Sequence, residues 1–407
     1  MGSPMKKLTL RYKNILLHRG QSASRNRKLK HYRGWGSAAR QPKVPTFHVS
    51  IWDGGEPFTA QCNVQAHACP SNLCLYENAG DTLKLLHKIK SGLWRVTPQT
   101  GGWVNRKKRG LPRIKAYFDF STIDRLSTAA ALIITSDYDR AKRISGIVPP
   151  AIDLENWGDD AFKVLYEIGF FELIGHVPGS HPALRYHDID DGRFRLMQIM
   201  SGKNSNELGN VAEGISGLID YLGSSHAVQD LSVEINGAVG EAMINVAKHA
   251  YPGDFRASRG FRAVGRWWVT ARADRDNNTL TLVIYDQGAT IPGTLPHRVW
   301  YNDIILEIKR TLGKSDASSA FMDPEFIAHS MKRGKTQTLE PGRGEGLPQM
   351  QELIDFCGTG CLRILSRSGA YIYERSHQRE PSVTKYKLPM PLEGTLVEWE
   401  LKLPEAA

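Results

Sequence analysis

Within its C-terminal half the chain reads Val283-Ile284-Tyr285-Asp286-Gln287-Gly288-Ala289-Thr290-Ile291-Pro292. An apolar strand is predicted to end here in an acid, which a glycine turn and an Ile-Pro pair follow. An acid at the end of a strand can accept a hydrogen bond from an amino group of a ligand in an otherwise apolar pocket. An ordinary strand-to-loop turn has the same pattern, so this stretch needs support from elsewhere in the chain.

A second motif lies upstream, on a long helix predicted over 228–250. Apolar residues recur on one face of this helix between Leu231 and Val246. Glu241 and Asn245 are four residues apart, so both side chains point to the same side. Carboxylate and amide oxygens are hard ligands of the kind that Mg²⁺ takes together with waters and phosphates. On its own, such a pair more often belongs to a solvated helix face.

A third motif follows the strand and consists of Gly342-Arg343-Gly344-Glu345-Gly346-Leu347, leading into an apolar helix over 348–356. Glycines at the start of a helix let backbone N–H groups approach phosphate oxygens, and the helix dipole favours an anion there. A single glycine triplet is weak evidence. The order and spacing of the three motifs carry the argument.

The elements around the motifs predict the fold class. A helix over 207–222 ends at Gly223, and further strand-like segments cover 267–273, 279–285, 362–366, 370–373 and 395–401. Helices followed by a set of antiparallel strands predict an α+β sandwich with helices on one face of a sheet.

Taken together, the three motifs resemble those of GHKL domains, the ATP-binding family shared by histidine kinases, gyrase, MutL and anti-sigma-factor kinases. The helix motif is similar to the family's asparagine box, and the other two are similar to its glycine boxes. The segments 331–336 and 394–401 resemble the lid over ATP and the closing strand. The resemblance covers 205–407 and implies the Bergerat-type α/β sandwich of this family.

The resemblance also implies roles for individual residues. Asn245 would hold Mg²⁺ against the phosphates of ATP, and Glu241 would activate the attacking water. Asp286 would bind the adenine amino group, and Gly288 would leave room for the base. Contacts to the phosphates would come from Lys335, Arg343, Gly344 and Gly346.

One position departs from the GHKL pattern. The family usually has a second glycine where this chain has Thr290. A β-branched residue allows the backbone less freedom than glycine does, so we expect a lower affinity for the nucleotide.

A segment before the GHKL-like region resembles a STAS domain, the fold of anti-sigma-factor antagonists. Residues 117–130 are similar to its strand-loop-helix, and 162–174 to a later helix, which implies a small α/β domain over 111–200. In the antagonists a partner kinase phosphorylates a Ser or Thr near the position of Thr128. Here Ser127 replaces the usual preceding Asp, and a hydroxyl at a helix start is more often structural.

The excess positive charge lies in one N-terminal arm, 1–45. Of the 53 Lys and Arg residues, twelve fall within the first 52 positions, where there is no Asp or Glu. The remaining 41 nearly balance the 42 acidic residues. Such a block is usually a solvated, flexible tail, and the alternative is a contact to the phosphates of a nucleic acid. Residues 46–110 give no assignable pattern.

Composition narrows the class of protein. No apolar run of about 18 residues occurs, and the first residues do not form a signal peptide. Five cysteines in a long chain do not indicate a disulfide framework, so we expect a cytoplasmic protein. Zinc is not favoured at Cys62, His67, Cys69 and Cys74, because their spacing lacks the tight knuckles of structural zinc sites.

The sequence therefore predicts a cytoplasmic regulator that binds Mg–ATP. Slow ATP hydrolysis would control the STAS-like module and the protein partner that it binds. Two alternatives stay open. One is an anti-sigma-type serine/threonine kinase acting on a STAS partner or on Thr128 of the same chain. The other is a nucleotide-gated protein that binds nucleic acid through 1–45.

Overall fold

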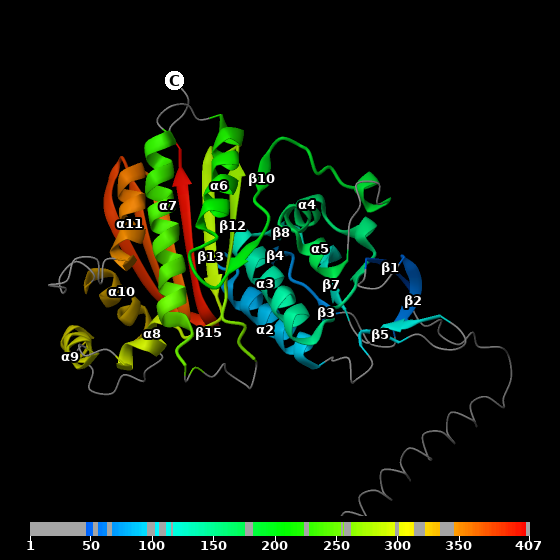
Figure 1. Cartoon of the computed structure of the whole chain (residues 1–407), viewed down its shortest axis with the longest axis horizontal. Helices are drawn as coiled ribbons and strands as arrows, with labels where there is room; N and C mark the ends of the chain where they lie inside the picture. The colour runs from blue at the N-terminus through cyan, green and yellow to red at the C-terminus, as the bar shows by residue number, and fades with distance from the viewer. Residues whose placement is uncertain are drawn as a thin grey trace, which may run out of the picture. The chain divides into compact units, whose positions relative to one another are not determined.

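In the computed structural model, residues 46–407 form one compact unit (Figure 1). The structure describes residues 46–51, 56–62, 67–95, 102–105, 111–114, 117–175, 182–223, 228–253, 255, 262–297, 301–312, 322–333 and 346–403. The basic arm thus lies outside the described residues. Those described combine helices and strands in a mixed α+β fold.

A six-stranded sheet forms the centre of the second unit. Its strands follow the order β10-β12-β13-β15-β14, and β11 also pairs with β12. All of these pairs are antiparallel. The bounds are β10 Phe194–Leu196, β11 Met200–Gly202, β12 Trp267–Asp274, β13 Thr279–Asp286, β14 Gly360–Ser376 and β15 Arg379–Lys402.

Three helices cover one face of this sheet, and Figure 1 shows them lying side by side. They are α6 (Leu208–Leu222), α7 (Val228–Asn245) and α11 (Gly346–Cys357). Alternate strand residues such as Trp267 and Ile284 are buried beneath them, as the two-residue period of a strand requires. The α6 helix ends at Gly223, whose positive φ of 74° suits a glycine.

The opposite face packs against helices from the first half of the chain. These are α2 (Ala79–Arg95) and α3 (Thr128–Ser145). The intervening strand residues Trp268, Val283 and Tyr285 point this way and share one apolar cluster with α3. The sheet is therefore buried on both faces, and the predicted limit near residue 205 is not a limit of the core.

The first half has a sheet of its own, ordered β5-β6-β2-β1-β9. Strand pairing joins 46–110, which has no assignable sequence pattern, to the residues after it: β1 pairs with β9 and β2 with β6. The bounds are β1 Thr46–Ile51, β2 Phe58–Cys62, β3 His67–Ala68, β4 Asn72–Leu73, β5 Val104–Asn105, β6 Arg113–Ile114, β7 Phe118–Asp119, β8 Arg125–Leu126 and β9 Ala151–Ile152. Further helices among the described residues are α4 Asp159–Glu167, α5 Phe170–Ile174, α8 Ile291–Thr294, α9 Tyr301–Leu312 and α10 Asp323–Arg333.

The start of α3 shows how local capping sets an element. Ser127 is the N-cap, and its hydroxyl accepts from the backbone N–H of Ala130 at 3.3 Å. The helix ends at Gly146, which has a left-handed conformation. Within the described ranges, no helix has the length and apolar character needed to cross a membrane.

Candidate functional site

The end of α7 carries the predicted metal ligand. Asn245 is the last residue of α7, and a π-helical turn, Val246–Ala250, follows it. Such turns often occur at functional sites. Glu241 lies one helical turn earlier and, like Asn245, is half-buried. The Nδ2 atom of Asn245 is buried and has no hydrogen-bond partner among the described residues.

Asp286 occupies the last position of β13, on the face of the sheet that α6, α7 and α11 cover. Only 4% of its surface is exposed, and burial raises the pKa of its carboxyl group to about 7. The carboxylate accepts from the backbone N–H of Gly288 at 2.8 Å and from that of Thr395. Among the described residues no lysine or arginine pairs with it. Asp286 is thus a buried acid whose carboxyl group is positioned by hydrogen bonds from two backbone N–H groups.

The loop after Asp286 is bonded to the π-helical end of α7. The N–H of Ala289 donates to the carbonyl of Ala250 at 2.6 Å, and the N–H of Gln287 donates to the hydroxyl of Tyr251 at 3.0 Å. A Cβ atom on Gly288 would lie 2.2 Å from the Ala250 oxygen. The close approach of two backbone segments therefore requires glycine here, a packing reason distinct from the predicted room for a base.

Thr290, the departure from the GHKL pattern, caps α8. Its φ of −75° and ψ of 158° are ordinary extended values, and its hydroxyl accepts from the N–H of Gly293 at 3.1 Å. This backbone conformation does not need glycine. The threonine therefore serves as an N-cap for a short helix and introduces no strain.

The hydroxyl groups of Ser366, which no motif includes, and of Thr395, in the predicted closing strand, support this loop. Ser366 accepts from the N–H of Ile291 at 2.9 Å and lies 2.9 Å from the hydroxyl of Thr395. Asp286 pairs with Thr395 across β13 and β15. Gly394 has a φ of 82°, and a Cβ there would lie 1.9 Å from the Asp286 carbonyl oxygen. Gly394 thus allows β15 to approach the backbone of Asp286 closely, and Thr395 donates its N–H to the Asp286 carboxylate.

The third motif is only partly described. Lys335, Arg343 and Gly344 fall outside the described residues. Gly346 begins α11, which packs beside α7, the helix that carries Asn245. The structure therefore brings the strand motif of Asp286 against the helix motif of Asn245, and it places the helix of the glycine motif beside that of Asn245. The predicted phosphate contacts stay predictions.

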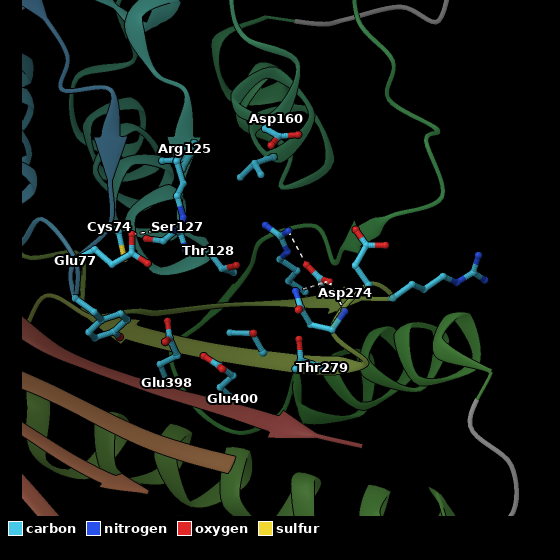
Figure 2. Close-up of a pocket in the computed structure, with 18 of the residues that line it drawn as sticks. Cys74, Glu77, Arg125, Ser127, Thr128, Asp160, Asp274, Thr279, Glu398 and Glu400 are labelled. Carbon is cyan, nitrogen blue, oxygen red and sulfur yellow. Dashed lines mark hydrogen bonds and ion pairs between the residues drawn. The ribbon is translucent and has the colours of Figure 1, made fainter. Parts of the chain in front are cut away.

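A separate cavity of about 1160 Å³ lies on the other face of the sheet (Figure 2). Thr128 lines it, and is 6% exposed. Facing strand residues include Arg363, which pairs with both Glu398 and Glu400 at 2.7 Å. Much of the charge in this cavity is therefore neutralised by its own partners.

Two of the four residues with the zinc-like spacing are described cysteines. Cys69 and Cys74 are buried free thiols, and the thiol of Cys69 points to the carbonyl of His67. Burial raises the pKa of the Cys69 thiol. The side chain of Cys62 lies outside the described set. The residues that can be placed contain no group of three or more metal-ligating acids, histidines or cysteines.

Comparison of the chain with models of protein families and with curated proteins gave no match.

Proposed function

We propose that 205–407 form a Mg–ATP-binding domain of the GHKL type, which hydrolyses ATP slowly. Its nucleotide state would control the STAS-like region, 111–200, and the protein that this region binds. The observation that carries the proposal is Asp286, a buried carboxylate at the end of a central strand without a cationic partner in the described parts of the chain. A buried acid of this kind is suited to accept a hydrogen bond from the amino group of an adenine ring.

Asn245 supports the proposal because its side chain fits a magnesium site. Its amide nitrogen is buried and unbonded in the part of the chain that the structure describes, and a phosphate oxygen would accept the hydrogen bond that this nitrogen can donate. Magnesium commonly takes one or two protein oxygens and completes its shell with phosphates and waters. A site with a single amide oxygen and a nearby carboxylate therefore suits Mg–ATP without a three-residue cluster.

Glu241 is the candidate for the catalytic base. It lies one turn before Asn245 on the same side of α7, so both would face the phosphates. The bound Mg²⁺ would neutralise charge on the phosphates. The carboxylate of Glu241 would accept a proton from the water that attacks the γ-phosphorus, the bond from this phosphorus to the bridging oxygen would break to release ADP, and Asn245 would orient the triphosphate.

The position of Thr128 favours hydrolysis over phosphorylation within one chain. Thr128 and Thr279 both line the cavity on the α3 side of the sheet (Figure 2). Asp286 lies on the α7 side, at the other end of β13. The sheet therefore lies between Thr128 and a phosphoryl group bound near Asn245 in this conformation.

A calorimetric titration with Mg–ATP, followed by a free-phosphate assay on the same sample, tests the proposal. We expect saturable binding and slow release of phosphate. Replacement of Glu241 by Gln should leave binding intact and stop the release, because an amide cannot take the proton. Absence of binding would overturn the proposal. If ATP labelled in its γ-phosphate binds and the label appears on protein, the result would instead support the kinase alternative.

The pH dependence of binding should report Asp286. Because burial raises its pKa from 3.8 to about 7, the folded chain holds a proton that the unfolded chain has already lost between about pH 4 and pH 7. Asp286 therefore lowers the free energy of unfolding as pH rises through this window. Nucleotide affinity should change in the opposite direction, because the ionised carboxylate is the better acceptor. We expect binding about tenfold tighter at pH 8 than at pH 6.

The variant Asp286→Asn serves as the control for this pH profile. It keeps an acceptor oxygen for the N–H of Gly288 but cannot titrate. Its affinity for Mg–ATP and its free energy of unfolding should vary less with pH than those of the wild type. The protonation of ATP itself affects both proteins equally, so it cancels when their profiles are compared. Identical profiles would show that Asp286 does not contact the base.

A further inference from the structure

Gln287, between Asp286 and Gly288, is held by α3 from the far side of the sheet. Its side chain is 3% exposed. Its Oε1 atom accepts from Nη1 of Arg140 at 2.8 Å. Its Nε2 atom donates to Oδ1 of Asp137 at 2.9 Å, and also approaches the hydroxyl of Ser136 at 3.3 Å. Both ends of the amide are thus committed to a helix that lies about 150 residues earlier in the chain.

The same cluster extends to α2 and to β15. Lys90 lies 4.0 Å from Asp137 and forms an ion pair with Glu393. The carbonyl of Glu393 accepts from the hydroxyl of Tyr285 at 2.7 Å. Arg140 is 1% exposed and donates to the carbonyl of Arg262 at 2.8 Å. The name interface cluster is used below for the four side chains at the centre of this network, those of Lys90, Asp137, Arg140 and Gln287.

Because the interface cluster is buried, its free energy depends strongly on the position of the Gln287 side chain. Desolvation raises the pKa of Asp137, while Lys90 and Arg140 oppose this shift. A buried polar network is stabilising when every member is paired and unfavourable when it is half-paired. Movement of Gln287 by an ångström or two would leave Arg140 and Asp137 without their amide partner. The cluster therefore fixes the position of the loop relative to α3.

We infer that Gln287 is a positioning residue through which nucleotide at Asp286 is coupled to the packing of α3 on the sheet. This inference rests on the proposed function. The neighbours of Gln287 in sequence are the proposed adenine acceptor and the glycine that contacts α7, so a bound base would hold the loop in the geometry that α3 recognises. By reciprocity, loosening α3 weakens nucleotide binding by the same factor.

Hydrogen exchange across Thr128–Ser145, measured with and without saturating Mg–ATP, tests the coupling. In the wild type we expect ATP to slow exchange of these α3 amides at least threefold. The variant Gln287→Leu keeps the approximate volume of the side chain but none of its hydrogen bonds. Its ATP affinity should fall about tenfold, and at saturation the ATP-dependent change in α3 should disappear.

Thr135→Val is the matched control for this experiment. Thr135 is a fully buried residue of the same helix, and its hydroxyl donates to the carbonyl of Ala131 within α3 at 2.7 Å. The substitution preserves side-chain shape and leaves the interface cluster intact. It should retain both the affinity of the wild type and the slowing of α3 exchange by ATP.

The possible outcomes separate this inference from the proposed function. A wild type that does not bind Mg–ATP overturns both. A wild type that binds ATP without a change in α3 overturns the coupling alone, and so does an unchanged ATP effect in Gln287→Leu. If Gln287→Leu does not fold, Arg140→Met removes the same hydrogen bond from the other side. Loss of the ATP effect in that variant supports the coupling, and its persistence overturns it.

Discussion

Replacing Asn245 with alanine is expected to abolish binding of Mg–ATP. In the proposed site its side chain is the only described protein group assigned to hold the metal against the phosphates, so its loss should raise the dissociation constant at least a hundredfold, about 2.7 kcal/mol. Folding should not suffer, because alanine removes a buried amide nitrogen that lacks a partner among the described residues. Calorimetry and urea unfolding on the same sample measure both quantities.

Asn236→Ala is the matched control for this variant. Asn236 belongs to the same helix and is also half-buried, but nine residues separate it from Asn245. At 100° per residue this spacing places the two side chains on opposite sides of α7. The control should bind Mg–ATP with the affinity of the wild type. Equal affinities in all three proteins would contradict the assignment of Asn245.

The helices and strands that the sequence predicts are those with a regular spacing of apolar residues or a clear stop signal. The helices before Gly223 and before Tyr251 have a regular apolar spacing and a strong stop signal, and the structure confirms both. The paired strands β12 and β13 alternate regularly and are joined by a polar turn. For these segments, local chemistry and the tertiary structure favour the same conformation.

The segments that were not predicted depend on partners distant in the sequence. Strand β1 gains its position from β9, about 100 residues later, and no local period marks either. Just before α3 begins at Thr128, Arg125 and Leu126 form a two-residue strand that pairs with β4, which nothing in the local sequence marks. Such pairing is decided by tertiary contacts, which override local preference.

The candidate site divides in the same way. The sequence correctly indicated that an apolar strand ends in Asp286 and that Asn245 lies on the long helix, but not that α7 ends at Asn245 in a π-helical turn. It gave no role to Gln287, because a glutamine in a turn is ordinary and its partners lie in a region without a motif. Buried polar pairs between remote segments leave no periodic pattern in a single sequence. The structure was needed to identify them.

Gly288→Ala is expected to have the largest effect on stability among the substitutions considered. The added Cβ would lie 2.2 Å from the oxygen and 2.7 Å from the carbonyl carbon of Ala250. Both atoms belong to backbone that ends α7, so neither can rotate away as a flexible side chain would. We expect the free energy of unfolding to fall by about 3 kcal/mol or more, measured by urea denaturation.

Gly217→Ala tests whether this loss comes from the close approach or from the change of residue type. Gly217 lies in α6, where a Cβ would meet no atom within 4 Å. Alanine there should raise the free energy of unfolding by about 0.5–1 kcal/mol, because it lowers the backbone entropy of the unfolded chain. The two variants should thus shift stability in opposite directions. A small effect in Gly288→Ala would mean that the loop can move away from α7, and the geometry proposed for Asp286 and Asn245 would then not be fixed by the fold.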